Sequence, residues 1–241
     1  MYTGVVAGLS PDQKRDLLAN VPLFNGLAPA ELDALIPVAR TVSLKSREEL
    51  FHKGDQGAQV YVVIRGKLKV LTTSESGDDV VFSILGPGEV FGEVALLGGT
   101  PRTATVTAID PCELLIIDRR DFLSFLRGHP DVAINLLEVL AQRMKRVSEF
   151  VEDTLFLNLP LRLAKKLVSL SQAYGQPHAQ GLRLDLKLSQ EEWGDLVGTT
   201  RESINKQLRA WTEEGLITID RGYIIINDRR GLEKLAGAVV Y

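Results

Sequence analysis

The sequence has very few of the residues that bind metals or cross-link a chain. Its 241 residues include one cysteine and three histidines. The single cysteine, Cys112, excludes an internal disulfide and any zinc or iron–sulfur site built from several cysteines. It lies in a strand-like apolar run, which predicts a buried structural thiol. His52, His129 and His178 lack the spacing of metal ligands, so we expect surface or loop histidines and no metal.

Long apolar runs and an export signal are missing as well. No run approaches the roughly 20 apolar residues that a membrane-spanning helix needs. The first residues, MYTGVVAGLSPDQKRD, lack a basic stretch followed by an apolar core. We therefore expect a cytoplasmic protein that has no membrane partner. No Ser/His/Asp or Cys/His set stands out either, so we expect a binding protein and not an enzyme.

Composition is ordinary for a soluble globular protein, with 45% apolar and 24% charged residues. The length suits one large domain or two modest ones. The net charge of −3 is unevenly distributed: residues 1–159 carry 16 basic and 21 acidic side chains, whereas residues 160–241 carry 12 and 10. The more basic C-terminal third is a faint indication of polyanion binding there.

Periodicity changes along the chain. Residues 17–24 and 28–36 have helical spacing and predict a short helical preface. Residues 41–118 are short β-rich runs broken by KGDQG, SESGDD, GPGEVFG and LGGTPR, which is typical of a compact β-barrel or jelly roll. The SESGDD segment between two apolar runs predicts a hairpin.

Helical spacing returns after residue 118. Residues 121–126 predict a short helix, and residues 131–158 predict a long one that Pro160 ends. Apolar residues recur along the long helix at spacings of three and four: Leu137, Leu140, Met144, Val147, Val151 and Leu155. This stripe packs either on its own domain or on a second copy. A helix of about 28 residues spans about 40 Å and outreaches a β-barrel, which favours a homodimer.

The C-terminal third has the pattern of a winged helix-turn-helix. Residues 161–175 predict an amphipathic helix and residues 181–188 a strand. In SQEEWGDLVGTTRESINKQLRAWTEEGLI, Ser189 and Glu192 form a capping box, Gly198 supplies the turn, and Thr199 or Thr200 caps a second helix over 201–214. A hairpin around Arg221–Gly222 follows. The alternative is an ordinary helical hairpin, which the wing after the second helix disfavours.

The segment FGEVALLGGTPRTATVTA, residues 91–108, brings an acidic and a basic residue together on one loop. Glu93 and Arg102 either pair with each other as a surface salt bridge or hold opposite sides of one small ligand. Gly98 and Gly99 let the connection turn without obstruction. The residues of this segment alone leave both interpretations open.

In order and over nearly its whole length, the chain resembles the bacterial cAMP receptor protein/FNR (Crp/Fnr) family of transcription regulators. The resemblance rests on FGEVALLGGTPRTATV, similar to that family's phosphate-binding cassette, and on TTRESINKQL, similar to its recognition helix. It implies an α+β fold: a cyclic-nucleotide-binding β-roll of the jelly-roll type over 1–130, a dimerisation helix over 131–159 and a winged helix-turn-helix over 160–241.

The resemblance also implies which residues hold the nucleotide. Glu93 would accept a hydrogen bond from the ribose 2′-hydroxyl, and Arg102 would pair with the cyclic phosphate. The backbone at Gly92 and Val94 would approach the sugar-phosphate, and Thr103 would donate to the phosphate or the base. The chemistry agrees, because a planar guanidinium suits a phosphate monoanion and an acceptor-only carboxylate suits a sugar hydroxyl.

The effector follows from the same resemblance. In cAMP-responsive relatives, consecutive Thr and Ser residues on the long helix read the adenine amino group, whereas this chain has Val147 and Ser148. Thr103 after the cassette arginine also resembles cGMP-selective domains. We place cAMP first and cGMP second. The alternative is a β-roll that is independent of ligand or senses another effector, such as cyclic di-GMP.

For DNA, the resemblance implies that Arg201, Glu202 and Lys206 face the major groove and that Asn205 joins them. A solvated helix face is the alternative for each. Expected phosphate contacts, with Ser203 as a weaker candidate, are Gln190, Thr199 and Thr200. The implied partners are pseudo-palindromic promoter DNA, a second copy of the chain and RNA polymerase.

Overall fold

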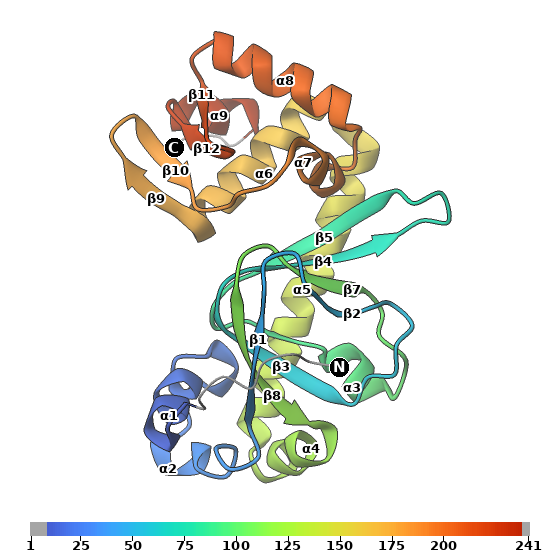
Figure 1. Ribbon diagram of the computed structural model, residues 1–241, viewed down its shortest axis with the longest axis vertical. Helices are drawn as coiled ribbons and strands as arrows, with labels where there is room; N and C mark the ends of the chain where they lie inside the picture. Colours follow the sequence, from blue (N-terminus) through green and yellow to red (C-terminus); the bar gives the residue numbers. More distant parts are fainter. Residues whose placement is uncertain (1–8, 238–241) are drawn as a thin grey trace. The chain divides into compact units, whose positions relative to one another are not determined.

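The computed structural model describes residues 9–237, which divide into two compact units (Figure 1). Residues 9–72 and 82–145 form the first unit, and residues 73–81 and 146–237 form the second. The predicted fold class is confirmed: a β-roll, a long helix and a winged helix-turn-helix follow one another along the chain.

The elements up to the long helix are α1 (Pro11–Ala19), the 3-10 helix η1 (Pro22–Phe24), α2 (Pro29–Leu32), β1 (Arg40–Leu44), β2 (Glu49–Phe51), β3 (Gln59–Arg65), β4 (Leu68–Thr73), β5 (Asp79–Leu85), β6 (Val90–Phe91), α3 (Glu93–Gly98), β7 (Thr105–Ala108), β8 (Cys112–Asp118), α4 (Arg119–Gly128) and α5 (Pro130–Phe156). The predicted bounds of the preface were wrong. A capping box at Ser10 starts α1 early, and Pro22 holds Val21 in an extended conformation, so no helix runs through residues 17–24.

The β-roll consists of two four-stranded sheets, in the orders β1-β8-β3-β6 and β2-β7-β4-β5. The predicted SESGDD hairpin is confirmed between β4 and β5, where the Ser74 amide donates to the Asp78 carbonyl over 2.8 Å. Strands β3 and β8 are buried on both faces, because one face lines the roll and the other lies under helices. This explains why both strands are continuous apolar runs and do not alternate with polar residues.

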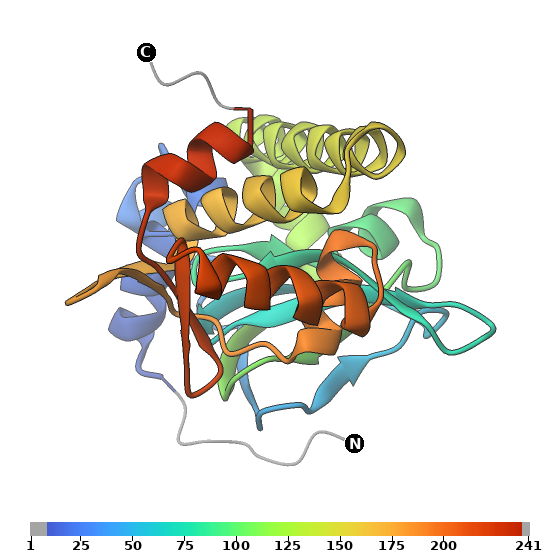
Figure 2. The same cartoon turned by 90° about the horizontal axis from the view of Figure 1, so that it is seen from above.

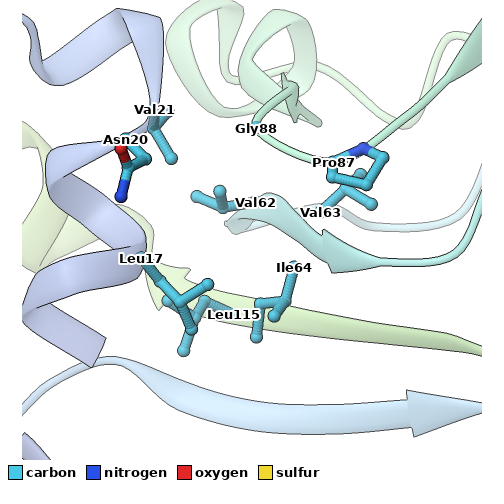
Figure 3. A pocket seen from close by; sticks show the side chains of 9 residues that line it. All are labelled: Leu17, Asn20, Val21, Val62, Val63, Ile64, Pro87, Gly88 and Leu115. Carbon is cyan, nitrogen blue, oxygen red and sulfur yellow. The ribbon is translucent and has the colours of Figure 1, made fainter. Parts of the chain in front are cut away.

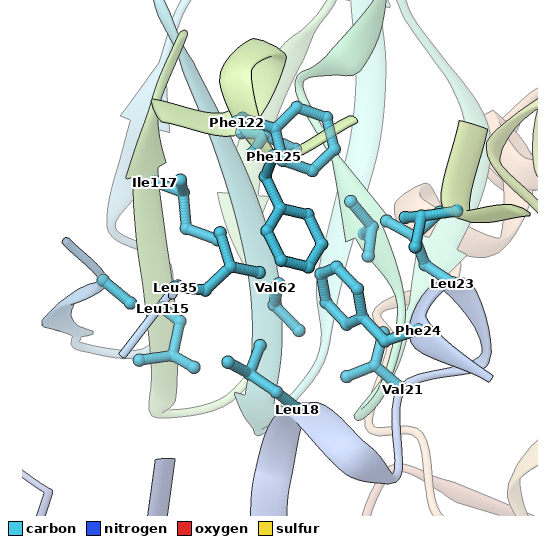
Figure 4. Close-up of a cluster of buried hydrophobic side chains, with 14 of the residues drawn as sticks. Leu18, Val21, Leu23, Phe24, Leu35, Val62, Leu115, Ile117, Phe122 and Phe125 are labelled. Atoms are coloured by element: carbon cyan, nitrogen blue, oxygen red, sulfur yellow. The ribbon is translucent and has the colours of Figure 1, made fainter. Parts of the chain in front are cut away.

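Helices cover the outer face of the first sheet and form a second apolar core with it (Figure 4). Phe24 from η1 meets Phe125 from α4 edge to face, with ring centroids 6.0 Å apart. Val132 and Leu136 bury the first turns of α5 in the same cluster. The long helix is thereby anchored on the β-roll at its N-terminal end.

A cavity of about 230 Å³ lies beside this core, between the end of α1 and the outer face of β3 (Figure 3). Leu17 and Val21 line it from the helical side, and Val62, Ile64 and Leu115 line it from the sheet. No charged side chain lines it, so this cavity offers no cation to a phosphate.

Cys112 is buried at the start of β8, as predicted. Its thiol contacts the carbonyl oxygens of Lys67 and Asp110, at 3.3 and 3.1 Å. Burial, reinforced by the Asp110 carboxylate, raises the pKa of the Cys112 thiol to about 12. The side chain is therefore a protonated, unreactive thiol at neutral pH, which agrees with a structural role.

The second unit contains α6 (Leu159–Tyr174), β9 (Gly175–His178), β10 (Gly181–Leu184), α7 (Gln190–Val197), α8 (Arg201–Glu213), β11 (Ile217–Asp220), β12 (Tyr223–Ile226) and α9 (Arg229–Leu235). Helix α9 packs along α6 (Figure 2), and the strands form one sheet in the order β11-β12-β10-β9. Pro160 does not end the long helix as predicted. It lies in the first turn of α6, which Asn158 caps. A proline fits there because the backbone N–H that it lacks would have no partner within the helix.

The predicted helix-turn-helix signals are confirmed. Ser189 and Glu192 form the capping box of α7, and Gly198 ends it in a left-handed conformation with φ +70°. Thr200, and not Thr199, caps α8 by accepting a hydrogen bond from the Ser203 amide. Arg221 and Gly222 both have positive φ between β11 and β12, as a tight hairpin turn requires. An ordinary helical hairpin is therefore excluded.

Among the described residues, the apolar stripe of the long helix is mostly exposed, and only Leu140 is partly buried. Leu140 contacts the helix-covered core of the first unit. The other side chains of the stripe are 50–70% exposed: Leu137, Met144, Val147, Val151 and Leu155. Because residues 131–156 contain no glycine or proline, the stripe continues without a break along one helix.

The described residues contain no group of side chains that could bind a metal ion. His52 and His178 are exposed, and His129 is half-buried, stacked on Phe125. Among residues 9–237, no three side chains of the ligating types come together as a metal site. Over the same range, no helix combines the length and apolar character that crossing a membrane demands.

Candidate nucleotide pocket and nucleic-acid interface

Glu93 and Arg102 are both buried in the β-roll, and they do not pair with each other. Glu93 is the first residue of α3 and is 1% exposed, whereas Arg102 precedes β7 and is 4% exposed. The interpretation of this segment as a surface salt bridge is therefore wrong. Each charge has its own partners, and each leaves one polar atom unpaired.

Glu93 pairs with an arginine that the sequence analysis missed. Arg143 on α5 donates to Glu93 Oε1 over 2.5 Å and also to the Val90 carbonyl. Its one sequence signal is weak: it immediately precedes Met144 of the apolar stripe, where a half-buried charge has to find a partner. Glu93 Oε2 is buried and accepts no hydrogen bond from the described residues. The carboxylate therefore has one oxygen held by α5 and one available for a donor.

Arg102 is held by neutral groups. Its Nη1 donates to the carbonyl oxygens of Gln59 and Gly92, at 3.0 and 3.1 Å, and its Nη2 contacts the Tyr61 hydroxyl at 3.4 Å. Within residues 9–237 it forms no ion pair, and its buried Nε has no acceptor. A buried guanidinium without a counter-charge is expensive. This is the donor set that a phosphate monoanion would satisfy.

The other predicted residues of the cassette surround these two charges unevenly. Gly92 caps α3 in the left-handed region at φ +84°, and Gly99 ends it at φ +63°. Val94 and Thr103 have exposed side chains. Ser148 is also exposed. It belongs to the second unit, whereas Glu93 and Arg102 belong to the first, so the structure does not assign Ser148 to this pocket.

Helix α8 presents a polar face to solvent. Arg201, Glu202, Asn205 and Lys206 are exposed, while the buried face of α8 consists of Ile204, Leu208 and Trp211. The exposed face therefore matches the one predicted to read DNA. It continues to Arg209, an exposed residue one turn further that helical spacing from Asn205 predicts and that the sequence analysis omitted.

Five of the predicted DNA contacts already have local partners. Gln190 donates its side-chain amide to Asn205 over 3.2 Å, which ties the start of α7 to the exposed face of α8. The Thr200 hydroxyl caps α8 and donates to the Ser203 hydroxyl over 3.0 Å. Thr199 is half-buried at the turn, where its amide donates to the Gly194 carbonyl.

A β-roll with a buried, unpaired arginine, followed along the chain by a long helix and a winged helix-turn-helix, defines a class: transcription regulators that join a ligand domain to a DNA-binding domain. Comparison with known families agrees with this class. Residues 41–129 match the cyclic nucleotide-binding domain, and residues 161–235 match the Crp-like helix-turn-helix domain. The protein belongs to the Crp/Fnr family of transcription regulators.

Similar proteins include two regulators named for cAMP. The CRP-like cAMP-activated global transcriptional regulator of Mycobacterium tuberculosis is 31% identical over 221 residues, which cover 92% of this chain and 99% of that one. The cyclic AMP receptor protein of Thermus thermophilus is 33% identical over 215 residues, covering 89% and 96%.

Among solved structures, the cyclic di-GMP-responsive global regulator CLP of Xanthomonas campestris has the same fold. Its TM-score is 0.74 at 21% identity, and the match covers 83% of this chain and all of that one. At this identity the likeness concerns the fold alone.

We predict that Arg143→Met destabilises the first unit by about 3 kcal/mol, because it leaves the buried Glu93 carboxylate without its counter-charge. Urea unfolding measures the free energy. Adding Glu93→Gln should recover most of the loss, since no buried charge then remains unpaired. Arg120→Met is the control, because that side chain is 91% exposed. Equal stabilities for Arg143→Met and Arg120→Met would contradict a stabilising ion pair.

Proposed function

We propose that the protein is a cyclic-nucleotide-responsive transcription regulator that binds pseudo-palindromic promoter DNA as a homodimer, with cAMP favoured over cGMP. The observation that carries this is the buried Arg102 guanidinium, which is held by carbonyl oxygens and has no carboxylate partner within residues 9–237. A protein that only needed a stable roll would gain by pairing or replacing such a charge. An anionic ligand supplies the missing counter-charge.

The residues of the cassette have complementary roles toward such a ligand. Arg102 would donate to the phosphate oxygens, and the free Oε2 of Glu93 would accept a hydrogen bond from a ribose hydroxyl. The backbone at Gly92 and Val94 would approach the sugar-phosphate, and the exposed Thr103 hydroxyl would donate to the phosphate or base. A cyclic nucleotide has an anionic phosphate for the Arg102 donors and a ribose hydroxyl for the Glu93 acceptor.

The choice of effector rests on the relatives and on three residues. Two similar regulators are named for cAMP, which favours cAMP here. Val147 supplies no hydroxyl beside Ser148, and Thr103 resembles cGMP-selective domains, so cGMP is second. A β-roll that is independent of ligand or binds cyclic di-GMP is the remaining candidate.

Coupling to DNA would run through α5. Arg143 links Glu93 to this helix, and the same helix continues into the unit that carries the helix-turn-helix. A ligand at Glu93 therefore acts on a residue of α5 directly. To regulate, the effector must bind the DNA-competent state more tightly than the other state, because only differential affinity shifts the balance.

Two features support the homodimer and its use of DNA. The exposed stripe on α5 is an apolar surface that water would otherwise cover, and helical spacing suits a second copy of α5. In that dimer each subunit contributes one α8, whose exposed Arg201, Glu202, Asn205 and Lys206 would read one half-site, while Gln190, Thr199, Thr200 and Ser203 would lie near phosphates. We propose domains at 1–130, 131–159 and 160–241, and RNA polymerase as a further partner.

We predict that a cyclic nucleotide raises the melting temperature of the wild type and not of Arg102→Ala. Saturation at 100 times the dissociation constant adds about 2.7 kcal/mol of stability. Thermal shift and calorimetry with cAMP, cGMP and cyclic di-GMP identify the effector. Circular dichroism must show that Arg102→Ala is folded. Wild-type affinity in the folded variant would contradict the pocket.

Replacing Met144 and Val151 together by Asp should convert the dimer to folded monomers, measured by light scattering. Both side chains are at least half exposed within one chain, so the fold does not depend on them. Leu140 is unsuitable because it packs on the core. Gln142→Asp is the matched control, since Gln142 is exposed on the opposite side of α5. A double variant that stays dimeric would place the interface elsewhere.

Half-sites on the DNA should lie about 34 Å apart, one helical turn. Arg201→Ala should cost about 1–3 kcal/mol per half-site and relax the preference at one base step. Thr199→Ala removes an expected phosphate contact and keeps the backbone hydrogen bond to Gly194, so it should instead weaken all sequences alike. Affinities are measured with and without cAMP or cGMP at one salt concentration. Unchanged base preference refutes the readout, and wild-type affinity that is insensitive to both nucleotides refutes the regulation.

A further inference from the structure

Arg102 lies against two aromatic rings that no part of the proposed function has used. Its Cζ is 4.3 Å from the centroid of the Phe51 ring, at the end of β2, and 5.3 Å from that of Tyr61 on β3. Tyr61 is itself fixed: it stacks on Phe91 with centroids 5.1 Å apart, and its hydroxyl donates to Gln59 Oε1 over 3.1 Å. The guanidinium therefore rests on a rigid aromatic surface.

Gly57 closes another side of the guanidinium. A Cβ at this position would lie 2.4 Å from Arg102 Nε and 2.7 Å from its Cζ, so any side chain would displace the guanidinium. The φ of Gly57 is not in the left-handed region, so the backbone conformation does not require a glycine there. A glycine is required because the Arg102 side chain occupies the space that a Cβ would fill.

The pattern of hydrogen bonds leaves one edge of the guanidinium available. Both N–H groups of Nη1 face the carbonyl oxygens of Gln59 and Gly92, and one N–H of Nη2 faces Tyr61. The Nε N–H has no acceptor within residues 9–237, and Nη2 has one contact for its two N–H groups. Nε and Nη2 share one edge of the guanidinium, which matches two oxygens of a phosphate.

We propose that Phe51, Tyr61 and Gly57 are positioning residues that hold Arg102 with its Nε–Nη2 edge directed at the ligand phosphate. Aromatic faces and carbonyl oxygens stabilise a buried cation without neutralising it, whereas a carboxylate would compete with the phosphate for the same fork. The Arg102 side chain is then ordered before the ligand binds, so binding loses little side-chain entropy there. This inference rests on the proposed function and specifies how its phosphate is bound.

The first test is the affinity for cAMP, cGMP and cyclic di-GMP by calorimetry. Phe51→Leu should weaken binding by about 2- to 12-fold, the cost of ordering one freed side chain. Gly57→Ala should weaken it at least as much while the protein stays folded. Gly128→Ala is the matched control, because a Cβ there meets nothing within 4 Å and its φ is ordinary. It should leave the affinity unchanged.

A second series separates an electrostatic role of Phe51 from plain packing. Incorporation of phenylalanines with increasing numbers of ring fluorines at position 51 keeps the shape of the ring and withdraws its negative face. Affinity should fall steadily with fluorination if the ring holds the cation. Packing alone would leave it constant, and a constant affinity across the series in a protein that binds cAMP overturns the proposal.

A third measurement does not need a ligand. A double-mutant cycle with Phe51→Leu and Arg102→Met, followed by urea unfolding, should give a favourable coupling between the two side chains. Wild-type protein that binds none of the three nucleotides refutes the proposed function. In that case, a favourable coupling energy between Phe51 and Arg102 still supports the aromatic contact, and a coupling energy of zero overturns it. The failure of the proposed function and the failure of this inference are therefore distinguishable.

Discussion

A carboxylate and a guanidinium both lie out of water in this β-roll, and neither neutralises the other. Burying a charge in a protein is costly unless hydrogen bonds and opposite charges replace the water that it loses. Glu93 is compensated by Arg143, which reaches it from α5, and Arg102 by carbonyl oxygens and aromatic rings. The roll therefore keeps one charge paired and the other stabilised but unpaired.

This division of partners gives the two charges different consequences. Glu93 is tied to a helix that leaves the β-roll, so a change at its free oxygen bears on Arg143 and hence on α5. Within residues 9–237, Arg102 is tied only to groups of the roll itself, the carbonyl oxygens of Gln59 and Gly92 and the Tyr61 hydroxyl. In the proposed function one residue senses the ligand and transmits its presence, while the other supplies most of the attraction.

The strands around this site are packed on both faces, whereas α5 is packed over part of its length. Two cores on either side of β3 and β8 fix the strands that carry Gln59 and Tyr61. By contrast, α5 is anchored on the roll through its N-terminal half, by Val132, Leu136, Leu140 and Arg143, and most of its apolar stripe is exposed. In the proposed function, a second copy of the chain covers this surface, and the helix relays the presence of the ligand.

Much of this follows from local sequence. The capping box of Ser189, the left-handed turn at Gly198 and the hairpin at Arg221–Gly222 are each set within a few residues, so their patterns sufficed to predict a winged helix-turn-helix. The cassette motif likewise singled out Glu93 and Arg102. Their partners were beyond prediction, because Arg143 is 50 residues from Glu93 and Gln59 is 43 from Arg102. Which charges meet, which stay unpaired and which glycine makes room are decided by the folding of distant strands and helices against each other.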